Sequence, residues 1–123
     1  MSAVPAKRFE DLWIWQEARD LVRHIYADFA TGSGARDFGF RDQVRRAGMS
    51  VMSNIAEGFE RSGQIDRARF FDIARASCGE VRSLYAVADD LTYVTSDRAA
   101  AIQAKARRLA AGIRAFAGTL RRK

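Results

Sequence analysis

The sequence has little of what disulfide scaffolds and most catalytic sites are built from: its 123 residues include one cysteine, one histidine and one proline. Cys78 has no second cysteine to pair with, so an internal disulfide is excluded and we expect a reduced, cytoplasmic setting. The first eight residues contain Lys7 and Arg8 and no apolar run, which is unlike a signal peptide. The longest stretch without a charged residue, 47–56, is about half of what a bilayer requires, so no segment is expected to span a membrane, and we predict no membrane partner.

The rest of the composition is typical of a globular protein. Hydrophobic residues make up 48% of the chain and charged residues 29%, which excludes a disordered chain. A chain of this length buries roughly two-thirds of the surface that it exposes when unfolded, enough for a core without disulfides. We predict a single domain that spans residues 1–123.

The excess of positive charge lies at the carboxyl end. The formal net charge is +6, yet residues 1–96 hold 13 basic and 14 acidic side chains. Residues 97–123 hold eight basic side chains and one acidic side chain, Asp97. Such asymmetry is typical of proteins that contact nucleic acid or a membrane surface, although a solvated tail that only keeps a protein soluble has the same pattern. The eight basic residues are Arg98, Lys105, Arg107, Arg108, Arg114, Arg121, Arg122 and Lys123.

Hydrophobic periodicity predicts four helices and no strand. Apolar residues recur every three or four positions over about 9–30, 38–61, 64–94 and 97–121. The breaks at 31–34 and 62–63 are rich in glycine and serine, and 95–97 supplies hydroxyls and a carboxylate that can cap a helix. Long amphipathic helices with short connections predict an all-α fold, an antiparallel up-down-up-down four-helix bundle.

Each helix has one apolar stripe that is expected to face the core. In the first helix Trp15 lies on this stripe, whereas Trp13 lies off it and is a candidate for an exposed or intersubunit contact. In the third helix the steps alternate between four and three residues, a heptad-like seam. The residues of that seam are Phe70, Ala74, Ser77, Val81, Leu84, Ala88 and Leu91.

In the last helix, the side chains on either side of the apolar stripe are also small. Small side chains allow close approach, so this helix is a candidate to lie between its own bundle and a neighbouring subunit; the alternative is that alanine is there for its helix propensity. The flanking residues are Ala99, Ala100, Ala101, Ala104, Ala110, Ala111, Gly112, Ala115, Ala117 and Gly118.

Few residues offer catalytic or metal-binding chemistry. Asp20, His24 and Asp28 are spaced four apart on the first helix and could line one edge as cation ligands, but we expect them to face water. We interpret Cys78 as a small buried hydrophobe, and Asp89 and Asp90 as a solvated pair because adjacent residues diverge on a helix. The sequence therefore predicts a protein that is not an enzyme and has no metal and no cofactor.

The second helix contains polar residues close to its stripe. Gly58 follows Ile55 by three positions and is expected on the core side, where it permits close approach or ends the helix. Glu57 can reach Arg61 one turn later. We predict a polar network that fixes the register of the bundle. Its candidate members are Arg45, Arg46, Asn54, Glu57, Arg61 and, on the third helix, Glu80.

Three segments together resemble a known family. Phe9-x-Asp11-Leu12-x-x-Trp15-Gln16-x-Ala18, Gln43-x-Arg45-Arg46-Ala47 and Ser53-Asn54-Ile55-Ala56-Glu57-Gly58-Phe59 resemble the four-helix-bundle proteins associated with intervening sequences in bacterial large-subunit ribosomal RNA genes. The motifs Phe70-Phe71-x-Ile73-Ala74 and Ser77-x-x-Glu80 also fit, whereas Met52 and Ala76 stand where the family usually has proline and glycine. The likeness covers about residues 9–120.

The resemblance implies an antiparallel bundle that assembles into a ring, typically a homopentamer, with no well-defined biochemical role. The family is similar in architecture to the basic accessory protein of diversity-generating retroelements, which binds nucleic acid and a reverse transcriptase. Architecture alone transfers function only weakly.

From charge and resemblance together, the sequence favours a homo-oligomeric, non-enzymatic bundle that binds RNA or DNA through phosphates. The eight basic residues of 97–123 would provide affinity without sequence preference. The alternative is a protein–protein scaffold whose basic edge docks an acidic partner.

Overall fold

The computed structural model describes residues 6–121, except the side chain of Arg121, and over that range the chain is all-α, as predicted. Four long helices are formed: α1 (Trp13–Asp28), α3 (Phe38–Glu60), α4 (Gln64–Asp90) and α5 (Ser96–Arg121). Two short elements accompany them, the 3-10 turn η1 (Phe9–Asp11) and α2 (Gly32–Arg36). None of the described helices is long and apolar enough to cross a membrane.

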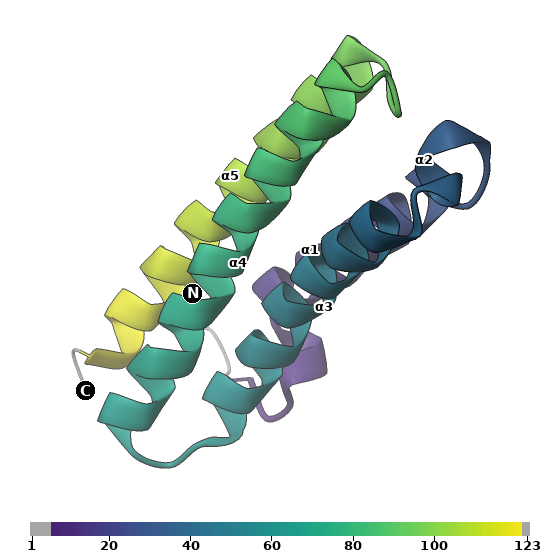
Figure 1. Ribbon diagram of the computed structural model, residues 1–123. Helices are drawn as coiled ribbons and strands as arrows, with labels where there is room; N and C mark the ends of the chain where they lie inside the picture. Colours follow the sequence, from purple (N-terminus) through teal and green to yellow (C-terminus); the bar gives the residue numbers. More distant parts are fainter. Residues whose placement is uncertain (1–5, 122–123) are drawn as a thin grey trace.

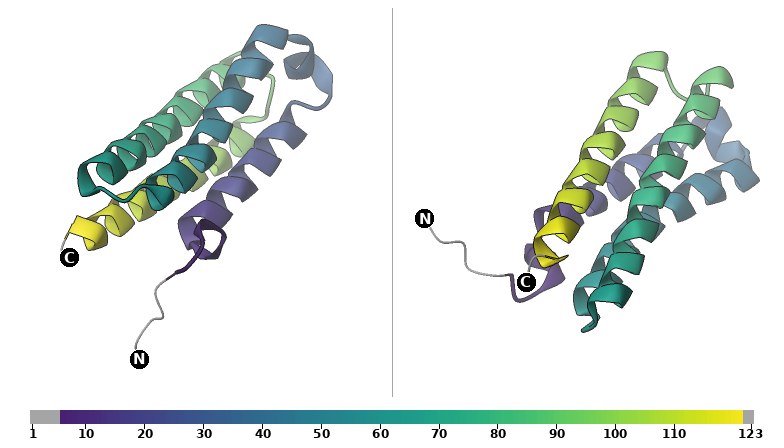
Figure 2. Two further views of the ribbon diagram at one scale, coloured as in Figure 1. Left: turned by 90° about the horizontal axis from the view of Figure 1, so that it is seen from below. Right: turned by 90° about the vertical axis from the view of Figure 1, so that its left-hand side faces the viewer.

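The long helices are arranged so that each lies beside the next (Figures 1 and 2). Ser50 of α3 bonds Ser77 of α4, and nearer the connecting loop Gly58 meets Phe71, so α3 and α4 run antiparallel. α5 also packs beside α1, which completes the bundle. Arg98 of α5 donates a hydrogen bond to Asp28 of α1, and Gly112 lies against the Trp13 ring. These contacts also run in opposite order along the two helices, so α1 and α5 are antiparallel.

The core is a single cluster to which all four long helices contribute. Ile25, Val51, Tyr85 and Ile113 are among its fully buried side chains. Burying an aliphatic or aromatic side chain of this kind stabilises the fold by roughly 1.5–3 kcal/mol. The apolar stripes predicted from periodicity are therefore the source of the packing energy.

The prediction of one continuous first helix over 9–30 is wrong, because the structure divides this segment into η1 and α1. Leu12 adopts an extended backbone (φ −77°, ψ 132°) and separates η1 from α1. Its buried side chain joins the core, which explains why the helical period continues across the break. The glycine-rich 31–34 stretch is also more ordered than predicted: it opens α2 at Gly32, whose φ of 87° few residues other than glycine adopt.

The third predicted helix, 64–94, extends too far. α4 ends at Asp90, and Thr92 follows with a left-handed φ of 56°. The seam is also rotated relative to the prediction, because Phe71 and Tyr85 are buried in place of Phe70 and Leu84, which lie at its edge. Leu91, predicted on the seam, is 47% exposed.

Two glycines let helices approach closely. A Cβ on Gly58 would lie 2.9 Å from the Phe71 ring, which confirms that this glycine faces the core. A Cβ on Gly48 would lie 2.7 Å from the Ile25 side chain, which locates the close contact of α3 with α1. Larger side chains at either position would push the helices apart.

Candidate nucleic-acid interface

The cations of α5 separate into two groups. Arg107, Arg108 and Arg114 are exposed on the outer sides of the helix. The helix that holds them begins with a capped turn, in which the amide of Arg98 donates to Oγ1 of Thr95, as the hydroxyl-rich 95–97 segment predicted. Arg122 and Lys123 lie outside the described residues, as does the side chain of Arg121.

Arg98 and Lys105 do not lie with the others. Contrary to expectation, both point to α1, where carboxylates neutralise them. Arg98 Nε donates to both oxygens of Asp28, at 2.9 and 3.1 Å. Lys105 Nζ lies 2.7 Å from Asp20 and 3.1 Å from Glu17. These two cations hold α5 to α1, and we leave them out of the candidate interface.

The same contacts correct the interpretation of the Asp20, His24 and Asp28 edge. These side chains do not simply face water, because His24 Nδ1 accepts from Arg98 Nη2 at 2.8 Å and Asp28 accepts from the Tyr85 hydroxyl at 2.7 Å. A hydrogen-bonded chain therefore runs between α1 and α5 with one branch from α4. Within the described part of the chain, no group of three or more His, Cys, Asp or Glu side chains could hold a metal ion.

The ion pairs between α1 and α5 shift the pKa values of Asp20 and Lys105. A hydrogen bond from Lys105 lowers the pKa of Asp20 below its ordinary value. Burial opposes the charged form of Lys105, but hydrogen bonds to Asp20 and Glu17 outweigh it and raise the pKa of Lys105. Both groups are therefore charged over the neutral range.

A shallow groove runs between α4 and α5 on the other side of α5. It consists of two open hollows of about 500 and 650 Å³ that share Arg75 and Ala110, so they are continuous. Arg82 lines the first and Arg114 the second, while small residues form the floor. We call this feature the α4/α5 groove; its floor is Ala76, Gly79, Ala110, Ala111, Ala115 and Gly118.

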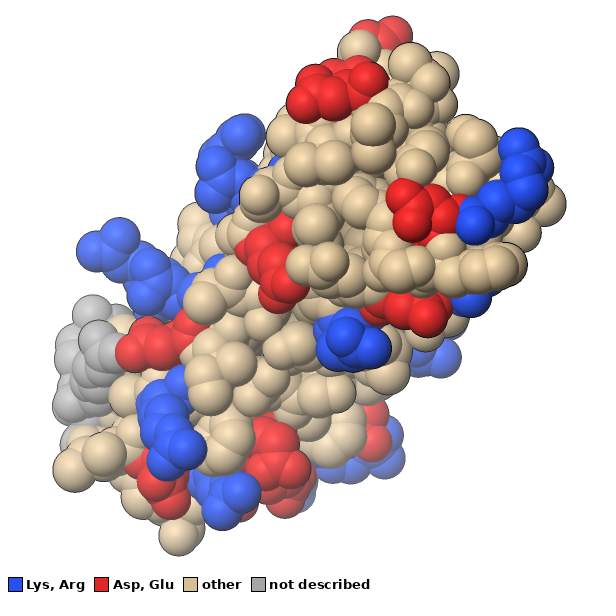
Figure 3. Space-filling view, viewed as in Figure 1, with Lys and Arg blue, Asp and Glu red and all other residues tan. Residues whose placement is uncertain are grey.

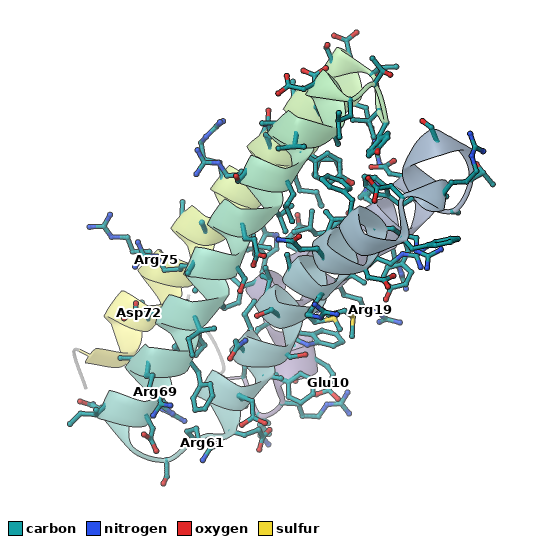
Figure 4. The ribbon with its side chains drawn as sticks, in the orientation of Figure 1. Glu10, Arg19, Arg61, Arg69, Asp72 and Arg75 are labelled. Carbon is teal, nitrogen blue, oxygen red and sulfur yellow. The ribbon has the colours of Figure 1, made fainter. Side chains whose placement is uncertain are left out.

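Arg75 is the central cation of the α4/α5 groove and retains hydrogen-bonding capacity. Its Nη1 lies 3.5 Å from Asp72, a long ion pair on the exposed side of α4. Its Nε–H is shielded from solvent and meets no acceptor among the described residues. Asp72 and Arg75 lie together on α4 (Figure 4), and Lys and Arg side chains project at the α4 and α5 edge of the space-filling view (Figure 3).

Sequence reasoning missed the arginines of α4. Arg75 and Arg82 were counted in a segment where 14 acidic side chains outnumber 13 basic ones, although their spacing of seven residues repeats that of Arg107 and Arg114. Seven residues are close to two helical turns, so each pair lies on one side of its helix. This shared spacing was the available signal, but only the packing of α4 on α5 brings the two rows together.

The predicted polar network does not form as one unit. Among the described residues, Glu57 and Arg61 are the one hydrogen-bonded pair of the six, at 3.2 Å on the surface. Arg45 instead donates to the carbonyl of Phe29 and covers the Tyr26 ring at 4.4 Å. Asn54 donates to the carbonyl and hydroxyl of Ser50. Arg46 and Glu80 line a separate hollow of about 390 Å³ between α3 and α4.

Other candidate residues have structural surroundings. Cys78 is fully buried, and burial raises the pKa of its thiol to about 12, so it remains protonated at neutral pH. Trp13 is 50% exposed and lies over Gly112 of α5, within its own chain. Asp89 accepts from the Ser96 hydroxyl at 2.6 Å and so joins the end of α4 to the start of α5, rather than forming a solvated pair with Asp90.

The fold and the α4/α5 groove define a class: antiparallel helical bundles with an exposed arginine surface. Comparison with known families is more specific. Residues 10–115 match the model of the 23S rRNA-intervening sequence protein family, and the chain belongs to that family, as the sequence motifs indicated.

A solved structure shows the same fold. It is a protein of unknown function of the S23 ribosomal protein family from Bacteroides thetaiotaomicron, 15% identical, with a TM-score of 0.78. The match covers 85% of this chain and 95% of that one. The comparison with curated protein sequences found no match.

Proposed function

We propose that this protein binds RNA or DNA without sequence preference, through exposed arginines of α5, and does so as a homo-oligomer. One observation supports the proposal above the others: Arg114 of α5 and Arg75 of α4 line one groove whose floor is made of alanine and glycine. Arginine forms forked hydrogen bonds to phosphate, and a floor of small side chains lets a polymer backbone approach.

Phosphate contacts provide affinity but no base discrimination. Arg107, Arg108 and Arg114 are exposed, and neither hollow of the α4/α5 groove has the enclosed, apolar character of a small-molecule site. The name of the family directs attention to ribosomal RNA as one polymer to test. A bacterial cytoplasm is the setting in which we place this activity.

The test is titration of fluorescently labelled RNA and DNA with the protein at rising salt. We expect binding that weakens steeply as salt increases, because condensed counterions are released from phosphates. The variant Arg107→Gln/Arg108→Gln/Arg114→Gln should lose most of the affinity. The matched control, Arg23→Gln/Arg36→Gln/Arg69→Gln, removes three exposed arginines outside α5 and should bind normally. Absence of binding, or equal losses in both variants, contradicts the proposal.

An acidic protein partner is the competing occupant of the same arginines. Polyglutamate is a suitable probe because it has carboxylates on a flexible chain and no phosphate. If polyglutamate displaces labelled RNA at an equal concentration of charge, a scaffold that docks an acidic partner explains the surface better. Displacement by duplex nucleic acid alone supports the proposal.

Self-association, with a pentamer as the expected form, has its best support on the outer side of α4. Ile73, Leu84, Val87 and Leu91 follow one another at intervals of eleven, three and four residues and therefore share one side of the helix. Ile73, Val87 and Leu91 are each 39–47% exposed. A row of exposed apolar side chains on a helix is typical of an interface, and this one leaves the α4/α5 groove open.

A further inference from the structure

Two glycines in the α4/α5 groove have no explanation in the packing of the chain itself. A Cβ atom on Gly79 of α4 or on Gly118 of α5 would meet nothing within 4 Å among the residues that the structure describes. Glycine inside a helix costs about 0.5–1 kcal/mol relative to alanine. By contrast, Gly48 and Gly58 are required by side chains that touch them. The absence of side chains at 79 and 118 keeps the floor of the groove low where a ligand would lie.

The arginines follow one another along that floor. Arg82 lines one hollow, Arg114 the other and Arg75 both, so Arg75 lies between the other two. Arg107 is exposed two turns before Arg114 and on the same side of α5. The arrangement is concave in shape and positive at its edges, which complements a convex ridge of negative charge.

Aromatic side chains are missing from the described residues that line the two hollows. Besides the arginines and the floor of small residues, the lining includes Asp72 and Thr119. Proteins that hold single strands stack the unpaired bases on aromatic rings, which supply about 1–3 kcal/mol per base. A double helix has its bases paired inside and exposes phosphates, so it needs no such rings.

We propose that the α4/α5 groove receives the sugar-phosphate ridge of a double helix. Arg75, Arg82, Arg107 and Arg114 bind successive phosphates, and Gly79 and Gly118 allow the ridge to reach the floor. This inference rests on the proposed function and adds to it the form of the polymer and the participation of α4. RNA and DNA duplexes share the phosphodiester chemistry and are separated by experiment.

The sharpest test fills the groove without changing its charge. Gly79→Gln/Gly118→Gln places two uncharged side chains on the floor, and glutamine is a good helix former, so folding is retained. Gly39→Gln is the matched control: a Cβ there also meets nothing within 4 Å, but Gly39 lines the hollow between α3 and α4. Thermal unfolding followed by circular dichroism checks that each variant is folded.

The probes are labelled RNA and DNA duplexes of about two helical turns, and single-stranded oligouridine and oligothymidine with the same number of phosphates. We expect the wild type to bind a duplex at least about tenfold more tightly than the single strands. Gly79→Gln/Gly118→Gln should weaken duplex binding about tenfold or more, and Gly39→Gln should not. The preferred duplex, RNA or DNA, identifies the source of the ridge.

The outcomes separate this inference from the proposed function. Equal or tighter binding of single strands overturns the duplex inference and leaves nucleic-acid binding in place. Unchanged duplex binding by Gly79→Gln/Gly118→Gln also overturns it, provided that the α5 triple arginine variant loses affinity. If the wild type binds none of the four polymers, the proposed function itself fails.

Discussion

Lys105 has the positive charge that phosphate binding requires, but it stabilises the contact of α5 with α1 instead. Its side chain is 13% exposed and its ammonium group contacts Asp20 and Glu17 of α1, so a phosphate would have to displace two carboxylates. Arg98 is in the same position beside Asp28. Counting charges along the chain could not separate these cations from Arg107 and Arg114, because the distinction depends on which side of α5 faces α1.

The Asp20–Lys105 pair predicts a stability that depends on pH. The lowered pKa of Asp20 means that its contribution is present above the unfolded value of 3.8 and is lost as the pH falls through the lower folded value. The raised pKa of Lys105 places the opposite limit above 10.5. We expect the wild type to lose thermal stability below about pH 4, and Asp20→Asn to lose less over the same interval.

Melting temperatures measured from pH 2 to pH 7 on both proteins check this prediction. Asp42→Asn is a suitable control, because Asp42 is an exposed acid paired with its neighbour Arg41 on α3. If wild type and Asp20→Asn lose stability in parallel, the pair does not contribute as described.

Substitution of glycine by alanine should have opposite effects on fold stability at Gly58 and at Gly79. A methyl group at Gly58 meets the buried Phe71 ring at 2.9 Å, so Gly58→Ala should destabilise the fold by about 1–2 kcal/mol after the gain in helix propensity. A methyl group at Gly79 meets nothing, so Gly79→Ala should stabilise it by about 0.5–1 kcal/mol. Chemical denaturation measures both; stabilisation by Gly58→Ala would contradict the close α3–α4 contact.

At the scale of the elements, the α4/α5 groove is formed by two helices whose charge compositions differ. α5 has an obvious excess of positive charge, whereas α4 has slightly more carboxylates than arginines. Asp72 lies in the groove and pairs with Arg75, so it competes with any phosphate. The pair is long and largely exposed, which makes it easy to displace.

Removing that competition should strengthen binding. Asp72→Asn eliminates one negative charge from the groove and releases Arg75, and we expect affinity for duplex nucleic acid to rise about two- to fivefold at low salt. Asp66→Asn, on the first turn of α4, is the control for a general change in net charge. An equal gain in both variants would show that only net charge matters and that the groove has no special role.

The helix boundaries show what periodicity can and cannot predict. The amphipathic pattern identified the four long helices, since each must bury one stripe. It extended the first through Leu12, which is buried outside the helix, and the third through Val94, which is partly buried in the turn that follows α4. Apolar residues in a turn can continue the spacing of a helix. The backbone angles at Leu12 and Thr92 result from the packing of the connections and leave no mark on the hydrophobic pattern.

For the molecule as a whole, the fold class and the family could be predicted from the sequence, and the candidate site only in part. Arg107, Arg108 and Arg114 were identified correctly as exposed cations of the last helix. Arg75 and Arg82 were not identified, because adjacency between helices is a property of the bundle. The predicted six-residue network is replaced by separate local contacts, because its formation also depended on which side chains the bundle brings together.

Self-association yields a prediction at this scale. Ile73→Glu/Val87→Glu introduces charge into the exposed apolar row of α4, where repulsion and desolvation would oppose contact with another copy. We expect the wild type to be an oligomer by light scattering and the variant to dissociate towards a monomer. Thr119→Glu/Ala115→Glu, on α5, should leave the assembly intact. A monomeric wild type would exclude self-association.

The most direct test of the central claim, that arginines of α4 and α5 bind phosphates together, is the salt dependence of duplex affinity. Each phosphate contact adds about −0.9 to the slope of log affinity against log salt concentration. Arg75→Gln/Arg82→Gln should therefore reduce the steepness of the slope by about 1.8 per groove, although both residues lie outside the basic last helix. An unchanged slope would show that α4 takes no part and would contradict the account.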